Sequence, residues 1–351
     1  MTSTAGVPVY LQGNTTWDGT LVVDPGPTTG GAFHITRDGG TIAVTPGAQI
    51  QVLQGAALRL NGTADALSDG IDHVSVQNQS TINGFEVSNG TKNVGAVGGG
   101  GVTTVHAGGN LVADHIRQGT ATINGTAQIR NVASAASGVS VINNLTIGAA
   151  GKLDLTTNKL ITNTPAGTAT TPAPVGSGRI YDGVQGMVQS AKNGDAWNGP
   201  GLTSSTAATS NGLTTIGVST GAAVKSLGAT ETGLWAGQTV TASSVLAMYT
   251  YAGDANLDGA DYGTLDNWIQ FPGTDGYANG DVNYDGVIDG ADYGVLDNTI
   301  QLQGAPLPGV TGAFEGAGAA ASVSAVPEPS ACGFALLGAA AALKRRRRRG
   351  C

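Results

Sequence analysis

The chain has 351 residues, enough for two or three domains, and only 11% of them are charged and 5% aromatic, while 57 are glycine. Abundant Thr, Val and Asn favour short strands joined by turns and exclude an ordinary disordered chain. Residues 344–349 hold six of the sixteen Lys and Arg, so the rest has 10 basic and 24 acidic residues, a net charge of −14. Such an acidic body excludes nucleic acid and anionic lipid as partners.

Cysteine usage and the first residues bear on export. Cys332 and Cys351 both lie in the last twenty residues, so the preceding chain predicts neither a disulfide nor thiol chemistry. The opening MTSTAGVPVYLQGN has no basic start and no apolar core, so we expect no signal peptide within this sequence.

Residues 1–164 contain short runs of alternating apolar and polar residues, separated by Gly, Asn or Asp. Strands of four or five residues cannot bury an apolar face alone, whereas stacking them as rungs of a coil buries one face of each. The pattern therefore predicts a mainly β fold with an N-terminal parallel β-solenoid (β-helix). The clearest runs are residues 41–45, 49–53, 57–60, 73–76, 121–124, 127–130, 139–142, 144–147 and 152–155.

A β-sandwich of ordinary hairpins is the alternative architecture for this region. Strands this short are unusual in sandwiches, which favours the solenoid. The sequence shows no fixed repeat length, so the number of rungs stays open, and residues 148–162 are expected to form the last rung.

Residues 165–178 are rich in Thr, Pro, Ala and Gly, a composition typical of a linker. Beyond them, Val184, Met187, Val188 and Ala191 have the spacing of one face of a short amphipathic helix. Residues 214–218 and 245–251 have the pattern of strands. We therefore expect residues 179–252 to form a small α+β connector.

Residues 253–303 contain a duplicated acidic module with ten Asp and no Lys, Arg or Glu between residues 254 and 300. The second copy places oxygen-bearing groups at positions 1, 3, 5, 7, 9 and 12 of one loop, with Gly286 at the sharp turn. A Ca²⁺ ion takes about six to eight oxygen ligands, which this spacing supplies from a single loop. The predicted ligands are Asp281, Asn283, Asp285, the Val287 carbonyl, Asp289 and Asp292.

The first copy is shorter by four residues. Tyr262, Leu265 and Ile269 recur at one constant spacing, as Tyr293, Leu296 and Ile300, which predicts two equivalent helix faces. Asp254 recurs at a shorter spacing, as Asp281, so positions 7 to 9 of the first loop are missing. Its candidate ligands are Asp254, Asn256, Asp258 and Asp261, and an acidic turn that binds nothing is the alternative.

The pair of units, GDxNxDG followed by ADYGxLDN, resembles a type I dockerin over about fifty residues. That resemblance implies an EF-hand-like helix pair, calcium-dependent folding and a cohesin-like domain as partner. Recognition positions of that family correspond here to Gly290 and Ala291, which offer little side chain. Docking on the chain's own connector, residues 179–252, is therefore the alternative, and Trp268, Tyr262 and Tyr293 are candidate interface residues.

Residues 304–325 are expected to be a second linker and residues 326–351 a sorting tail. Pro327, Glu328 and Pro329 precede thirteen apolar residues and a cluster of Lys and Arg. The run is shorter than the ~20 residues of a spanning helix, and the basic cluster marks the cytoplasmic side. This order resembles the PEP-CTERM signal, which implies export, transient membrane anchoring and processing by an exosortase-like enzyme; a basic nucleic-acid-binding tail is the alternative.

No catalytic motif stands out. His34, His73, His106 and His115 lack metal or nucleophile spacing, so we interpret them as surface or turn residues. The only acidic and basic residues that suggest a cluster in the solenoid are Asp69, Asp72, Asp114 and Arg117, and the alternative is that they lie in solvated turns.

We therefore expect a non-enzymatic exported protein of the cell surface or extracellular matrix, with calcium as cofactor. Solenoid, paired loops and tail together resemble large exported proteins of planctomycete-type bacteria. The alternatives are a carbohydrate-active β-helix enzyme, similar to polysaccharide lyases or hydrolases, and a carbohydrate-binding adhesin, each anchored through the same module. Either would make an extracellular polysaccharide the partner.

Overall fold

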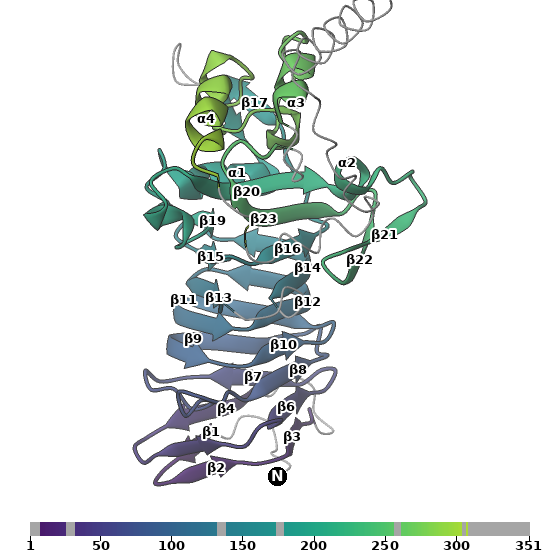
Figure 1. The fold of residues 1–351 in the computed structure, drawn as a ribbon. Helices are drawn as coiled ribbons and strands as arrows, with labels where there is room; N and C mark the ends of the chain where they lie inside the picture. The colour runs from purple at the N-terminus through teal and green to yellow at the C-terminus, as the bar shows by residue number, and fades with distance from the viewer. Residues whose placement is uncertain are drawn as a thin grey trace, which may run out of the picture. The chain divides into compact units, whose positions relative to one another are not determined.

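The N-terminal body is a coil of mostly parallel strands, seen in the computed structural model in Figure 1. The structure describes residues 8–25, 32–131, 138–172, 179–255, 261–303 and 307, which all belong to one compact unit of residues 1–313. The predicted parallel β-solenoid-like body is confirmed. Its strands are β1 (Pro8–Leu11), β2 (Thr15–Trp17), β3 (Thr20–Val23), β4 (Ala32–Arg37), β5 (Ile42–Val44), β6 (Gln49–Val52), β7 (Ala57–Leu60), β8 (Ser75–Asn78), β9 (Gly84–Asn93), β10 (Ala96–Gly98), β11 (Val102–Ala113), β12 (His115–Ile123), β13 (Thr126–Ile129), β14 (Val139–Ile147), β15 (Lys152–Asp154) and β16 (Lys159–Thr162).

The core lies inside the coil, because one side chain of each alternating pair points inward. Ile50, Val76, Val97 and Ile116 occupy equivalent positions on β6, β8, β10 and β12, and each is fully buried. Fully burying one such aliphatic side chain contributes about 1.5–3 kcal/mol. The coil is therefore stabilised by columns of stacked apolar residues that run through successive turns.

Turn length varies along the coil. One turn of the coil leads from His34 to its paired residue Arg59, and another leads from Glu86 to its paired residue Thr104. The first of these turns contains more residues than the second. Several strands are also longer than the predicted four or five residues; β9, β11, β12 and β14 have 9 to 12. The pairing of β9 with β11 shifts register between Val105 and Gly108 of β11. The strand bends at this irregularity, so its two halves lie on two faces of the coil.

The connector ends the coil by continuing its sheet. β19 (Gly201–Thr203) pairs in parallel with β15, so parallel stacking extends one strand beyond the predicted last rung. The predicted strands at 214–218 and 245–251 are confirmed as β20 (Thr214–Thr220) and β23 (Val245–Tyr251). β23 pairs antiparallel with both β16 and β20, and this reversal of direction ends the parallel ladder at that edge.

We call β19, β20 and β23 the cap of the coil, and the remaining elements surround it. The segment expected to be a linker, residues 165–178, contains β17 (Ala169–Pro172), which pairs with β18 (Arg179–Tyr181). The predicted connector helix is confirmed as α1 (Gly183–Lys192). The others are η1 (Ala207–Thr209), α2 (Gly221–Lys225), β21 (Thr232–Trp235), β22 (Gln238–Thr241), α3 (Asp261–Trp268), η2 (Tyr277–Asn279) and α4 (Gly290–Ile300).

The predicted sorting tail, with Pro327, Glu328 and Pro329, and most of the second linker lie outside the described residues. None of the helices that the structure describes is long and apolar enough to cross a membrane.

Lys159 is a buried cation where the coil meets its cap. Only 3% of the residue is exposed, and its ammonium group lies 6.0 Å from the centre of the Trp235 ring. Burial lowers the pKa of Lys159 from 10.5 to about 8. Between these pH values the unfolded chain binds the proton more tightly, so the free energy of unfolding rises as the pH increases from about 8 towards 10.5.

We expect Lys159→Met to raise the free energy of unfolding at neutral pH by about 1–3 kcal/mol, because a buried charge is replaced by an apolar chain of similar length. The variant should also lose the rise in stability above about pH 8. Urea unfolding followed by tryptophan fluorescence at several pH values measures both effects. Lys225→Met, at a half-buried lysine of α2, is the control. Lower stability at every pH would contradict this account.

Candidate metal centre

The second acidic loop, residues 281–292, connects η2 to α4. Gly286 occupies its turn with φ of +84°, in the left-handed region that favours glycine. Asp289 caps α4: its carboxylate accepts a hydrogen bond from the Ala291 amide at 2.7 Å, and Asp292 accepts one from the Asp289 amide at 2.9 Å. The loop and the helix start are therefore built by the same acidic side chains.

Asp281 and Asp292, the first and last predicted ligands, are fully buried. Asp281 accepts hydrogen bonds from the amides of Asp285 (3.1 Å) and Gly286 (2.7 Å). Asp292 accepts from the amides of Val282 (2.9 Å) and Asn283 (3.2 Å). Both carboxylates point inward and draw the loop backbone around them.

Burial raises the pKa of Asp281 to about 6, and the charge of Asp285 adds to this, while the Tyr181 hydroxyl and two backbone amides act against it. Burial likewise raises the pKa of Asp292 to about 7. In the described part of the chain no Lys, Arg or His forms an ion pair with Asp281, Asp285 or Asp292. Two buried carboxylates without a cation are costly, and this electrostatic environment suits a bound cation.

The other predicted ligands lie at the surface of the same loop. Asn283 and Asp285 are half-buried and bonded to each other, from amide Nδ2 to carboxylate Oδ2 at 3.0 Å. Val287 and Asp289 are exposed. Within the described ranges no three acidic, His or Cys side chains converge closely enough to hold an ion. The all-oxygen donor set suits Ca²⁺. In this structure its carboxylates accept hydrogen bonds from backbone amides.

Little of the first loop falls within the described residues. Asn256 and Asp258 lie outside them, as does the side chain of Asp261. Asp254 is 7% exposed, and its carboxylate accepts a hydrogen bond from the Thr250 hydroxyl.

Helices α3 and α4 are related by reciprocal contacts. The Tyr262 hydroxyl of α3 donates to Asp297 of α4 at 2.6 Å, and the Tyr293 hydroxyl of α4 donates to Asp266 of α3 at 2.5 Å. Leu265 and Leu296 are buried. The two tyrosines expected at an interface therefore hold the helices together.

Trp268, the third expected interface residue, differs from its equivalent in the second copy in what it contacts. Trp268 is half-buried and packs edge-on against Phe271, with ring centres 6.1 Å apart. Thr299, its equivalent in the second copy, is buried, and its hydroxyl donates to the Ala252 carbonyl at 2.7 Å. Only the second helix is therefore fixed to the end of the connector by this position.

The connector contributes groups that the sequence did not single out. The Tyr181 hydroxyl donates to Asp281 and accepts from the Gly276 amide at 2.6 Å. Gln189 donates to the Tyr284 carbonyl at 2.7 Å, and Gln185 accepts from the Tyr277 amide at 2.7 Å. The available signal was the pair of glutamines four residues apart, beside Val184 and Val188 on the buried side of α1.

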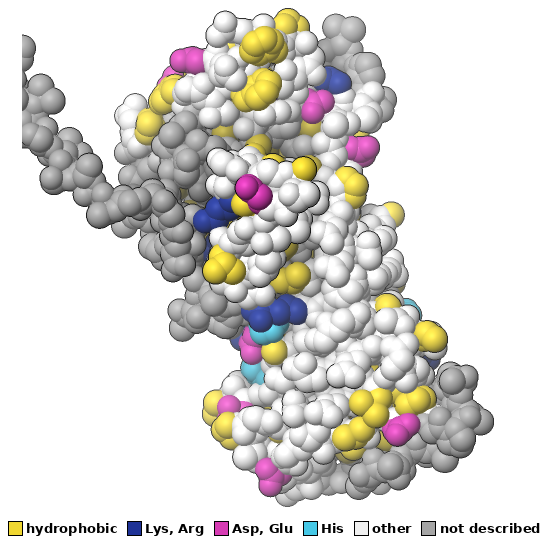
Figure 2. All heavy atoms as spheres, turned by 90° about the vertical axis from the view of Figure 1, so that its right-hand side faces the viewer, with side chains coloured by type: hydrophobic (Ala, Val, Ile, Leu, Met, Phe, Trp, Pro, Cys, Tyr) yellow, Lys and Arg dark blue, Asp and Glu magenta, His cyan; other side chains and the backbone are white. Residues whose placement is uncertain are grey.

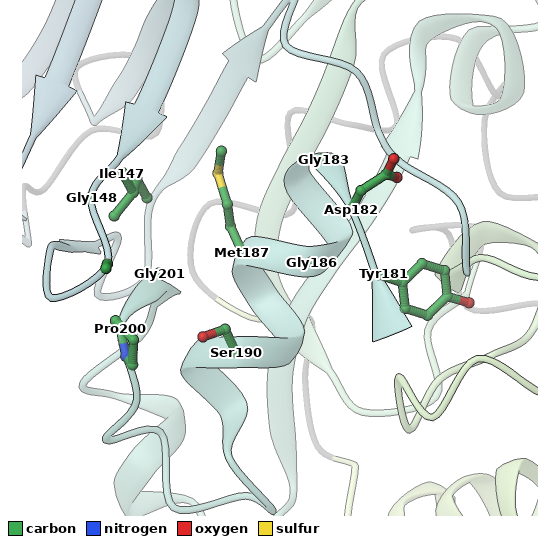
Figure 3. Close-up of a pocket in the computed structure, with 11 residues that line it drawn as sticks. Ile147, Gly148, Tyr181, Asp182, Gly183, Gly186, Met187, Ser190, Pro200 and Gly201 are labelled. Carbon is green, nitrogen blue, oxygen red and sulfur yellow. The ribbon is translucent and has the colours of Figure 1, made fainter. Parts of the chain in front are cut away.

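Two cavities offer alternative sites. One of about 280 Å³ lies between α1 and the end of β14, where Met187 and Ser190 face Ile147 and Pro200, while the Tyr181 ring points away (Figure 3). The other, about 270 Å³, lies at the first coil against Leu11, Trp17 and Phe33. Both are smaller than typical ligand pockets, at about 300–1,000 Å³, and neither gathers charged groups.

A row of titratable side chains does lie on the outer face of the coil. His34, Arg59 and Glu86 are paired neighbours on β4, β7 and β9. The Glu86 carboxylate is 2.7 Å from Arg59 and 3.0 Å from His106, and the row continues as Thr104, Thr122 and Thr146. Sequence reasoning missed this row because the pairing depends on unequal turn lengths.

Two of the residues that the sequence offered as a cluster in the solenoid, Asp69 and Asp114, have structural contacts. Asp69 accepts amide hydrogen bonds from Val44, Ile71 and Asp72, and Asp114 forms an ion pair with Arg130. On the face seen in Figure 2 charged side chains are few, and most of the described surface is uncharged polar side chain or backbone.

We compared the chain with known protein families, curated proteins and solved structures. No family model matches the chain, and neither the curated proteins nor the solved structures provide a match.

We expect Gly286→Ala to destabilise the folded protein by about 1–3 kcal/mol, since the turn needs a positive φ. A Cβ atom there would also lie 2.5 Å from Cβ of Arg179. Gly290→Ala is the matched control, because nothing lies within 4 Å of its added Cβ. Thermal unfolding by circular dichroism compares the two; equal melting temperatures would contradict the contact between loop and connector.

Proposed function

We propose that this is a non-enzymatic exported protein of the cell surface or extracellular matrix whose acidic module binds one calcium ion. The proposed ligands are Asp281, Asn283, Asp285, the Val287 carbonyl, Asp289 and Asp292. The observation that carries the proposal is the burial of Asp281 and Asp292, both at 0% exposure, in a loop that forms no ion pair among the described residues. A divalent cation would neutralise these charges and bring the exposed Asp289 into the same shell.

The resemblance of the module to a dockerin supports the choice of calcium. Its helix pair, α3 and α4, is joined by the reciprocal Tyr262–Asp297 and Tyr293–Asp266 hydrogen bonds. We propose a single occupied site, because the first loop is four residues short.

We propose the connector of the same chain as the docking partner of the module, in preference to a cohesin-like domain. The second loop already contacts β18, α1 and β20 through hydrogen bonds of Arg179, Gln189 and Ile216. Gly290 and Ala291 offer little side chain to an outside partner.

Export and surface attachment rest on the tail. Pro327, Glu328 and Pro329, the apolar run and the Arg cluster support processing by an exosortase-like enzyme after transient membrane anchoring. The solenoid would supply length and a binding surface.

We expect calorimetry on the whole chain to detect one calcium site. Asp281→Asn and Asp285→Asn should each weaken binding by at least about tenfold, since each removes a charged ligand. Asp18→Asn, at an exposed carboxylate of the coil outside the module, should bind as the parent does. If the parent chain shows neither heat nor a gain in thermal stability with millimolar calcium, the proposal is wrong.

A carbohydrate-active enzyme, or an adhesin, is the second candidate, and the row of His34, Arg59, Glu86 and His106 favours it. Glu86 is 5% exposed and joined to both Arg59 and His106, which supports a structural ion pair rather than a free catalytic acid.

Incubation with a panel of polysaccharides distinguishes the candidates. We expect no soluble product from the parent chain and no difference between the parent and Glu86→Gln. Products that disappear in Glu86→Gln would establish the enzyme, whereas binding on a glycan array without products would establish the adhesin.

A further inference from the structure

Three polar side chains of the connector hold the second acidic loop and the η2 turn before it, and we name Tyr181, Gln185 and Gln189 the polar clamp. We infer that the polar clamp sets the calcium affinity of the loop, and that bound calcium in turn stabilises the cap of the solenoid. The inference rests on the proposed calcium site and makes Tyr181 a positioning residue for the first ligand, Asp281.

Tyr181 connects the clamp to the proposed ligand directly. Its hydroxyl donates to Asp281 Oδ2, the oxygen that also accepts the Gly286 amide at 2.7 Å. The same hydroxyl accepts from the Gly276 amide at 2.6 Å, just before the loop. Tyr181 is 4% exposed, so water does not replace these bonds without opening the interface. Groups that orient metal ligands in this way strongly affect metal affinity.

The two glutamines fix the backbone on either side of Asp281, in η2 before the loop and at Tyr284 within it. Gln189 Nε2 donates to the carbonyls of Tyr284 (2.7 Å) and Arg179 (2.8 Å), while its Oε1 accepts the Tyr181 amide at 3.0 Å. Gln185 accepts the Tyr277 amide at 2.7 Å. One side chain thus joins the loop, β18 and the backbone of Tyr181, so their positions depend on one another.

A second contact leads from the loop to the solenoid. Tyr284, at loop position 4, is 2% exposed and donates from its hydroxyl to the Ile216 carbonyl of β20 at 2.7 Å. Its ring stacks on Tyr277 with centroids 5.1 Å apart. β20 pairs with β23, which pairs with β16 of the coil. Ordering of the loop by an ion is therefore transmitted to the strands that end the coil.

Thermodynamic linkage makes the effect reciprocal. If the clamp favours the calcium-bound loop, calcium must favour the clamped connector by the same free energy. Bound calcium would then stabilise the end of the solenoid, and the docking partner of the module would be the connector of the same chain.

The whole chain with Tyr181→Phe tests the clamp, because the ring stays and only the hydroxyl is lost. We expect its calcium affinity, measured by calorimetry, to fall by about tenfold. Tyr249→Phe is the matched control, since Tyr249 is a tyrosine of β23 that is 7% exposed, and its affinity should equal that of the parent. Equal affinity of Tyr181→Phe and the parent would overturn the role of Tyr181.

Hydrogen exchange on the unmutated chain gives a second readout that does not depend on the variant folding. Calcium should slow exchange of the amides in Gly183–Lys192 and Thr214–Thr220, in addition to those of the loop. Calcium binding that protects the loop alone overturns the inference and leaves the calcium site standing. Absence of calcium binding in the unmutated chain means that the proposed function has failed, and the inference fails with it.

Discussion

Backbone hydrogen bonding between successive turns of the coil is the constraint on which the rest of this structure depends. A strand of four residues, such as β7, buries its apolar side only because β4 and β9 pair with it on both edges. Inside the coil the paired strands align residues such as Ile50, Val76 and Val97 into one column. An open end would leave backbone groups unpaired, and β23, running antiparallel to β16, supplies the cap at the C-terminal end.

The cap and the acidic loop form one continuous set of contacts. Asp281 and Asp292 are buried against the loop's own backbone, and Tyr181 of the connector bonds to Asp281. Burial raises the pKa of both carboxyls, which expresses the same electrostatic cost that a cation would remove. The connector is thus more than a spacer between the solenoid and the module, because it supplies the surroundings of the proposed metal ligands.

The duplication has diverged in the use of equivalent positions. Thr299 bonds to the connector end at Ala252, whereas Trp268, its counterpart in the first copy, packs on Phe271. Gly253 and Gly280 each leave room for a leucine of the opposite helix, Leu296 and Leu265. The pairing of the two helices is therefore symmetric, but at this pair of positions the second helix bonds to the connector through a buried hydroxyl, whereas the first packs on an aromatic ring of its own unit.

The sequence by itself determined the strand-forming runs, the mainly β fold class and the loop positions of Asp281 and Asp292. Alternation of apolar residues and loop spacing are local patterns, so both can be recognised from consecutive residues. It did not determine the turn lengths or the row of His34, Arg59 and Glu86, because cross-strand neighbours depend on how many residues each turn consumes. Only the tertiary structure brought Tyr181 to Asp281, far along the chain, since no local pattern encodes which distant hydroxyl will meet a buried carboxylate.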